Sequence, residues 1–176
     1  IKQLVEWLSL QDNAVRYQSF LLLQSRSAYH NDIYQYWDAF CDKLKSGNSY
    51  QRSIGLMLIA ENARWDSENK MDIIIDAYLE LLYDEKPITI RQCVQSLEKI
   101  ISAKPDLNEK IAASLVSLDL LSVKETMRKV ILQDIINVLC VIRKFGSSDS
   151  IESYISAALS GEILDKKAKK QIEALL

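Results

Sequence analysis

The sequence has few of the residues that break regular structure, with only four glycines and two prolines among 176 residues. All-β folds need a turn between successive strands, and glycine and proline serve many of these turns. Their scarcity leaves long helices as the expected structure. With 48% hydrophobic and 26% charged residues, the chain can bury a sizeable core. The sequence therefore predicts a folded, all-α protein.

Cysteine and histidine are scarce as well. Cys41, Cys93 and Cys140 are odd in number and far apart, so they do not form the paired framework of a disulfide-rich secreted domain. A zinc site needs several Cys or His ligands at short spacing, and His30 is the only histidine. These absences predict a cytoplasmic protein in a reducing environment, with no metal ligands.

Motifs of catalysis and of membrane insertion are also missing. The glycines are isolated, so the chain has no glycine-rich loop to bind phosphate. It has no G-x-S-x-G and no H-E-x-x-H. The apolar run at 56–60 is far below the ~18 residues that suggest a membrane span. We therefore expect a protein without catalytic residues, cofactor, small-molecule substrate or membrane span.

The chain does contain a repeated arginine. Arg16, Arg52, Arg91 and Arg128 follow one another at intervals of 36, 39 and 37 residues, a period typical of helical-repeat arrays. Each of these structural arginines opens a predicted helix whose apolar residues recur at helical spacing, so one face should be buried. In the last two helices the apolar residues are Ile90, Val94, Leu97 and Ile101, then Met127, Ile131, Ile135, Val138 and Ile142.

A second series of apolar stripes lies between these helices, so the chain alternates two helix types. Short loops between helices force neighbours to pack antiparallel. We predict one domain of about four to five stacked helix pairs, a right-handed α-solenoid. Its expected units are 1–29, 30–65, 66–104, 105–146 and capping helices at 147–176. The second stripe comprises Ile33, Trp37, Phe40 and Leu44, then Ile74, Tyr78, Leu81 and Leu82, then Ile111, Leu115 and Leu118.

The segments NAVRYQS, ITIRQCV and ETMRKVI carry the arginine in the first turn of the second helix of a pair. This pattern resembles the HEAT-repeat family, and the segment from Asp84 to Leu107 is loosely similar to small uncharacterised bacterial HEAT-like proteins. The resemblance implies a HEAT- or armadillo-like superhelix. In that family the arginine usually bonds an aspartate in the loop before its helix, and Asp12 matches for Arg16. Glu85 and Glu125 are possible substitutes in later units.

The resemblance implies a non-enzymatic scaffold or adaptor that binds a protein or peptide on its concave face, which the arginine-bearing helices form. Outward positions on these helices would supply a polar, mildly basic groove. The candidates are Gln18, Gln24, Arg52, Gln95, Lys99, Lys129 and Gln133. Tyr34 is a further candidate, because it shares a helix side with Asp38 and tyrosine is favoured at interfaces. An ordinary half-buried tyrosine is the alternative.

Two other features leave alternatives open. An acidic stripe predicts either a solvated outer face or a docking strip for a basic partner; it comprises Asp72, Asp76, Glu80 and Asp84. HEAT-like DNA glycosylases, which resemble this architecture, excise alkylated bases with tryptophans and an aspartate, and the chain has Trp7, Trp37 and Trp65. Residues 1–88 carry 9 Lys and Arg against 13 Asp and Glu, and residues 89–176 carry 13 against 11. This balance does not favour nucleic acid as the partner.

Overall fold

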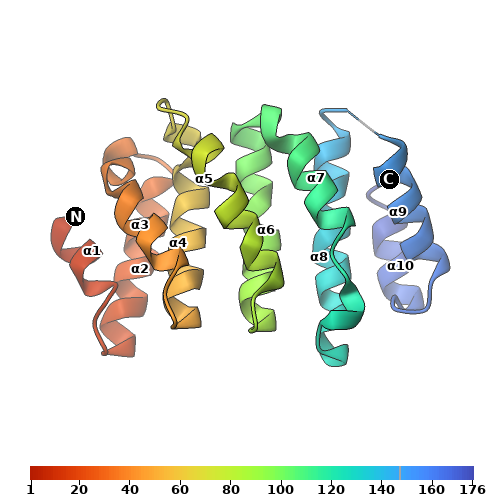
Figure 1. Cartoon of the computed structure of the whole chain (residues 1–176), viewed down its shortest axis with the longest axis horizontal. Coiled ribbons are helices and arrows are strands. Elements are labelled where there is room, and N and C mark those ends of the chain that lie inside the picture. Colours follow the sequence, from red (N-terminus) through yellow and green to blue (C-terminus); the bar gives the residue numbers. More distant parts are fainter. Residues whose placement is uncertain (147) are drawn as a thin grey trace.

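The computed structural model describes residues 1–146 and 148–176 (Figure 1). Those residues form ten α-helices and no strand, which confirms the prediction of an all-α protein. The α-helices are α1 (Lys2–Trp7), α2 (Asn13–Ser27), α3 (Trp37–Leu44), α4 (Ser49–Asn62), α5 (Lys70–Leu79), α6 (Pro87–Ala103), α7 (Asn108–Val116), α8 (Glu125–Arg143), α9 (Asp149–Ser160) and α10 (Lys166–Glu173). The 3₁₀ helices are η1 (Asn31–Tyr36), η2 (Ala63–Trp65), η3 (Glu80–Tyr83), η4 (Pro105–Leu107) and η5 (Leu120–Ser122).

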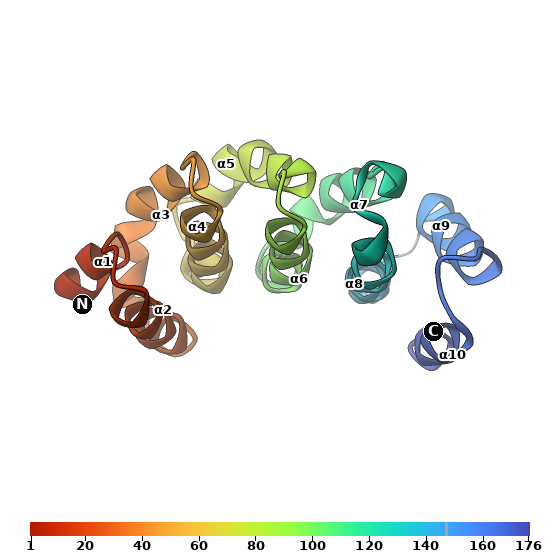
Figure 2. The same cartoon turned by 90° about the horizontal axis from the view of Figure 1, so that it is seen from below.

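The helices lie in two rows that follow an arc (Figure 2). Helices α1, α3, α5, α7 and α9 form the outer row, and α2, α4, α6, α8 and α10 form the inner row on the hollow side of the arc. Along the inner row, α4 packs against α2 and α6, and α8 packs against α6 and α10. Each predicted unit contains one outer and one inner helix, although residue 147, which opens the last unit, lies outside the described residues.

The apolar core runs between the two rows. Both predicted series of stripes contribute to it, and their members are buried except for Ile74 and Met127, which are half-buried against it. Burial of one apolar stripe per helix is the main favourable term that holds such helices together. The predicted stripes are therefore confirmed.

Side chains at the helix starts explain where several inner helices begin. The Asp12 carboxylate accepts hydrogen bonds from two backbone N–H groups of α2, and the Asn48 side chain accepts one from the Tyr50 N–H of α4. Asp165 caps α10. Helix α6 instead begins with Pro87, which has no N–H to leave unpaired, and its N-cap residue Lys86 makes no side-chain cap.

A glycine allows a close approach between α3 of the outer row and α4 of the inner row. A Cβ atom on Gly55 of α4 would lie 2.6 Å from the carbonyl oxygen of Phe40 and 2.9 Å from the Cβ of Lys43 on α3. Only a residue without a side chain fits between these helices. An isolated glycine inside a helix often has such a packing reason.

Candidate functional site

The repeated arginines form hydrogen bonds to the backbone of the segments that precede their helices. Three of the four donate a hydrogen bond from a terminal guanidinium nitrogen to a carbonyl oxygen in the loop before their own helix. The donors Arg16, Arg52 and Arg128 bond the carbonyl oxygens of Leu10, Ser46 and Leu121 at 2.9, 2.8 and 2.9 Å. Each of these bonds joins the segment before an inner helix to an arginine near the start of that helix.

The pairing of Arg16 with Asp12, which the family resemblance implied, is not present. Both backbone bonds to Asp12 come from Ala14 and Val15, at 2.9 and 3.1 Å, so this carboxylate serves as a helix cap. The Arg16 guanidinium instead bonds the side-chain oxygen of Asn13. That prediction was wrong because an aspartate directly before a helix can also cap the backbone N–H groups of that helix.

Two of the arginines reach forward to a carboxylate of the next unit. Arg52 donates from Nε and Nη2 to both oxygens of Asp84, at 2.6 and 2.9 Å, and the Asp84 side chain is only 2% exposed. Burial alone would raise the pKa of Asp84, but the bonds from Arg52 and from the Lys86 N–H hold it below its ordinary value. Arg91 donates from Nε to Asp134 of α8 at 2.7 Å.

Other predicted contact residues also tie neighbouring inner helices together. Gln95 of α6 donates to Asp134 of α8 at 3.1 Å, and Lys99 of α6 pairs with Glu61 of α4. Lys129 of α8 pairs with Asp165, the cap of α10. The polar groups of Arg52, Gln95, Lys99 and Lys129 are thus engaged within the chain, and their role in binding a partner stays a prediction. Gln18 is exposed, and Gln24 and Gln133 are half-buried.

Tyr34 is buried, which corrects its prediction as an exposed anchor. Its hydroxyl donates to Asp66 at 2.7 Å, and burial together with this carboxylate raises the pKa of Tyr34. Asp66 also accepts from the backbone N–H groups of Lys70 and Met71, both at 2.9 Å, and pairs with Lys104 at 3.1 Å. Tyr34 thus belongs to a buried polar cluster that connects residues of 30–65 with residues of 66–104.

The predicted acidic stripe does not follow a single helix, because α5 ends at Leu79. Three of its four carboxylates have cationic partners in the same chain. Asp72, Asp76 and Asp84 pair with Lys104, Lys110 and Arg52. These pairs offset the repulsion between neighbouring carboxylates. Asp72, Asp76 and Glu80 are exposed, as on an ordinary outer face, whereas the Asp84 side chain is buried.

The tryptophans of the glycosylase alternative belong to the packing of the first two units. Trp37 is buried, and Trp7 is half-buried. The indole N–H of Trp65 donates to the carbonyl oxygen of Ser27 at 2.7 Å. These positions give the tryptophans a structural role in joining helices.

A largely apolar hollow of the inner row lies between α2, α4 and α6, and we call it the N-terminal hollow. Its volume is about 630 Å³. The floor is formed by Phe20, Ile54 and Met57, of which the first two are buried. The lining residues are Asn13, Arg16, Tyr17, Phe20, Ser49, Tyr50, Ser53, Ile54, Met57, Lys86, Ile88 and Gln92. All of them belong to the inner helices α2, α4 and α6 or directly precede α6, so the hollow lies in the inner row.

Large apolar side chains project at the mouth of the N-terminal hollow. Tyr17, Tyr50 and Ile88 are 58%, 69% and 52% exposed. The Tyr17 ring lies 6.5 Å from the ring of Phe20, and the Arg16 guanidinium lies 5.9 Å from the centre of the Tyr50 ring. Contacts of this kind hold the rings in place before any partner arrives.

Sequence reasoning missed these three residues. It assigned the apolar stripes to the core and then looked for polar residues on the remaining face. Tyr50 and Ile88 are each the second residue of their helices, and Tyr17 directly follows a repeat arginine. A large apolar residue in the first turns of successive inner helices, outside the core stripe, is the signal that could have found the hollow.

A second hollow, of about 540 Å³, lies along the later part of α6. It brings together two predicted contact residues, Gln95 and Lys99, beside Arg64 and Glu98. Charges of both signs line it, and Lys99 is already paired with Glu61. This hollow therefore has fewer unengaged groups to offer than the N-terminal hollow.

The cysteines and the acidic residues form no reactive or metal-binding cluster in the part of the chain that the structure describes. Burial raises the pKa of Cys41 to about 11, and burial also raises the pKa of Cys93 and of Cys140. A thiol with a raised pKa is a poor nucleophile at neutral pH. Within the same described residues, no helix is long and apolar enough to cross a membrane.

Comparison with protein-family models and with curated proteins finds no match to this chain. Its function must therefore be argued from the geometry of its own surface.

Proposed function

We propose that this chain is a HEAT-like α-solenoid that binds another protein or a peptide along its inner row of helices, as a non-enzymatic scaffold or adaptor. The arc of two helix rows supports the architecture, because repeat arrays of helix pairs have this form. The ion pairs of Arg52 with Asp84 and of Arg91 with Asp134 connect the second predicted unit to the third and the third to the fourth, and so help to hold the inner face in one shape.

The observation that carries the proposal is the N-terminal hollow with its exposed apolar side chains. Tyr17, Tyr50 and Ile88 stand more than half exposed above a floor of core residues. Exposed apolar groups gathered at a concave surface mark interaction sites in soluble proteins. Tyrosine is among the residues that contribute most to binding at such sites.

A rigid inner face suits recognition of a protein segment. A partner that binds to preformed side chains loses less of its binding energy to ordering them. The rings of Tyr17 and Tyr50 are already placed by Phe20 and Arg16. We therefore expect binding to need little rearrangement of the inner helices.

The test is affinity capture from a nuclease-treated lysate of the source cells. The test variant combines Tyr17→Ser with Tyr50→Ser, and the matched control is Tyr29→Ser. Tyr29 is 78% exposed and follows the opposite end of α2 from the hollow. Substitutions of exposed side chains usually change stability by about 0.5 kcal/mol or less, so all three proteins should fold alike by circular dichroism.

We expect a specific protein to be retained by the wild type and by Tyr29→Ser, and lost by the double variant. Equal capture by all three proteins would contradict the proposed site. Retention of nucleic acid alone, in a lysate without nuclease, would contradict the proposed class of partner.

A further inference from the structure

We propose that the occupant of the N-terminal hollow is an acidic, amphipathic protein segment, in which large apolar side chains alternate with Asp or Glu. This inference rests on the proposed function and adds the chemistry of the partner. It follows from the charges at the hollow taken together with its apolar lining.

The charged groups that line the N-terminal hollow are both positive. They are Arg16 and Lys86, and no carboxylate lines the hollow among the residues that the structure describes. The acidic residues nearest in sequence are otherwise engaged: Asp12 caps α2, and Asp84 is paired with Arg52. Glu85 approaches Lys86 only to 3.7 Å, and its side chain is 68% exposed.

The N-terminal ends of the helices at this hollow contribute further positive charge. The first turns of α2, α4 and α6 contribute Asn13, Tyr50 and Ile88 to the lining. The start of an α-helix carries a partial positive charge, which favours anionic groups within about one turn. On α6 no side chain caps this end. A segment that carries carboxylates therefore meets complementary charge at Arg16, at Lys86 and at the uncapped start of α6.

The apolar part of the hollow requires apolar side chains in the same segment. Phe20, Ile54 and Met57 form a floor, and the exposed rings of Tyr17 and Tyr50 stand at its mouth. A volume of about 630 Å³ lies in the range of sites that bury a small ligand or a few side chains. A purely acidic segment would leave this apolar surface in water, and a basic segment would oppose Arg16 and Lys86.

Three labelled peptides of equal length provide the test by fluorescence anisotropy. The first sets Leu-Phe pairs among Asp and Glu residues. The second replaces each Asp and Glu of the first with Lys, and the third replaces each Leu and Phe with Ser. We expect the first peptide to bind and the other two to bind at least about tenfold more weakly, since either charge or apolar complementarity is lost.

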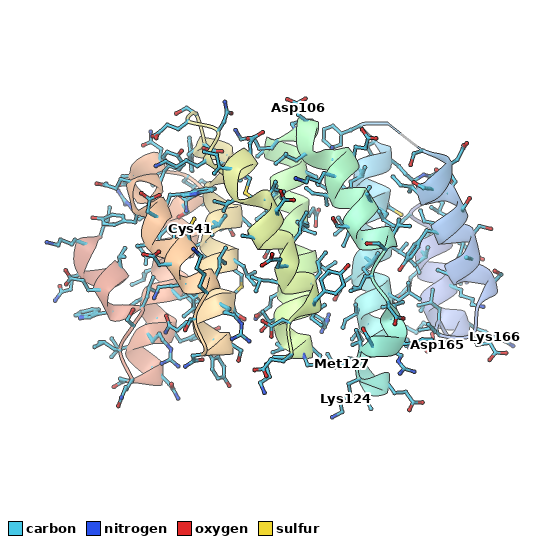
Figure 3. All side chains as sticks on the ribbon, in the orientation of Figure 1. Cys41, Asp106, Lys124, Met127, Asp165 and Lys166 are labelled. Atoms are coloured by element: carbon cyan, nitrogen blue, oxygen red, sulfur yellow. The ribbon has the colours of Figure 1, made fainter. Side chains whose placement is uncertain are left out.

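Charge reversal at Lys86 has a matched control on the next inner helix. Lys86 and Lys124 are the N-cap residues of α6 and α8, and only Lys86 lines the N-terminal hollow. Figure 3 shows Lys124 at the lower end of α8. Lys86→Glu should weaken binding of the acidic peptide about threefold or more, and Lys124→Glu should leave it unchanged. Glutamate at a helix start is favourable, so neither variant should impair folding.

The outcomes separate the two proposals. Tighter binding of the Lys peptide, lost in the Tyr17→Ser, Tyr50→Ser variant, would overturn the acidic occupant and leave the proposed function in place. Binding of the acidic peptide that neither the tyrosine variant nor Lys86→Glu weakens would place it elsewhere and overturn the inference. If no peptide binds but capture still yields a partner that depends on the tyrosines, only the acidic occupant fails; if capture fails too, both proposals fail.

Discussion

The central inner helices and the terminal helices differ in how deeply they are buried. Helix α4 buries nine of its 14 residues, whereas α9, nearly as long, buries two of its 12. Helix α10 buries two of eight, and α1 has no buried residue. Each central helix is covered on both sides by other units, whereas the end helices have a neighbour on one side only (Figure 2). Burial between units, more than helix length, should therefore decide which helices hold the fold together.

Substitution of Asp66 should destabilise the central part of the chain more than any other change proposed here. Its side chain is fully buried and accepts bonds from Tyr34 and from two backbone N–H groups, besides its pairing with Lys104. Asp66→Ala leaves the Tyr34 hydroxyl and the two backbone N–H groups without their acceptor and removes one of the carboxylates that pair with Lys104, so we expect the free energy of unfolding to fall by about 3–5 kcal/mol. Urea denaturation measures this loss. The control is Glu68→Ala, whose side chain is 60% exposed and which should change stability by about 0.5 kcal/mol or less.

The same cluster should make stability depend on acid. Burial alone would raise the pKa of Asp66, but its hydrogen bonds lower that pKa below the ordinary value in the folded state. A lowered pKa contributes stability that is present above the unfolded-state pKa of about 4 and lost as pH falls through the folded-state value. The stability difference between wild type and Asp66→Asn should therefore be constant near neutral pH and shrink below about pH 4. A difference that grows in acid would contradict this assignment.

Gly55 provides a test of the contact between the rows. The added Cβ of Gly55→Ala would meet the backbone oxygen of Phe40 at 2.6 Å, and backbone cannot move aside without separating α3 from α4. Alanine gains about 1 kcal/mol over glycine inside a helix, so the clash must exceed that gain. We expect a net loss of about 1–2 kcal/mol on thermal or urea denaturation.

Gly47→Ala is the matched control, because nothing lies within 4 Å of a Cβ at that loop position. It should leave the free energy of unfolding unchanged within about 0.5 kcal/mol. A stabilised Gly55→Ala protein would show that α3 and α4 can separate at little cost.

The sequence predicts the fold better than it predicts the surface. Apolar periodicity placed the core stripes because burial repeats with the helix, as the buried set from Ile90 to Ile101 shows. The short loops and Pro87 marked the helix ends for similarly local reasons. These features depend on residues a few positions apart, so the sequence alone is enough to find them.

The candidate site could not be predicted in the same way, because it depends on which long polar side chains find partners in other units. Lys99 and Lys129 have the positions of free surface cations, and only the packed structure brings Glu61 and Asp165 to them. Tyr34 has the sequence position of a half-exposed residue, but in the folded chain it is buried and donates a hydrogen bond to Asp66, 32 positions later. Conversely, Tyr50 becomes part of a hollow only when α2 and α6 lie beside α4.

Two lysine–carboxylate pairs, one in the central part and one near the C-terminal end, allow the smallest difference between these regions to be tested. Lys99 joins α6 to Glu61 of α4, whose side chain is only 8% exposed, whereas Lys129 joins α8 to Asp165, whose side chain is 55% exposed. Lys99→Met leaves a buried carboxylate without its cation, and we expect the free energy of unfolding to fall by about 1 kcal/mol. This value is at the low end for an unpaired buried group because the site borders solvent.

Lys129→Met leaves unpaired a carboxylate that water can solvate. The free energy of unfolding, measured by urea denaturation, should therefore fall by no more than about 0.5 kcal/mol. The two substitutions remove the same side chain and insert the same one, so their difference isolates the burial of the carboxylate partner. Equal losses would mean that the terminal pair contributes as much as the central one, and that burial of the partner does not set the strength of these ties.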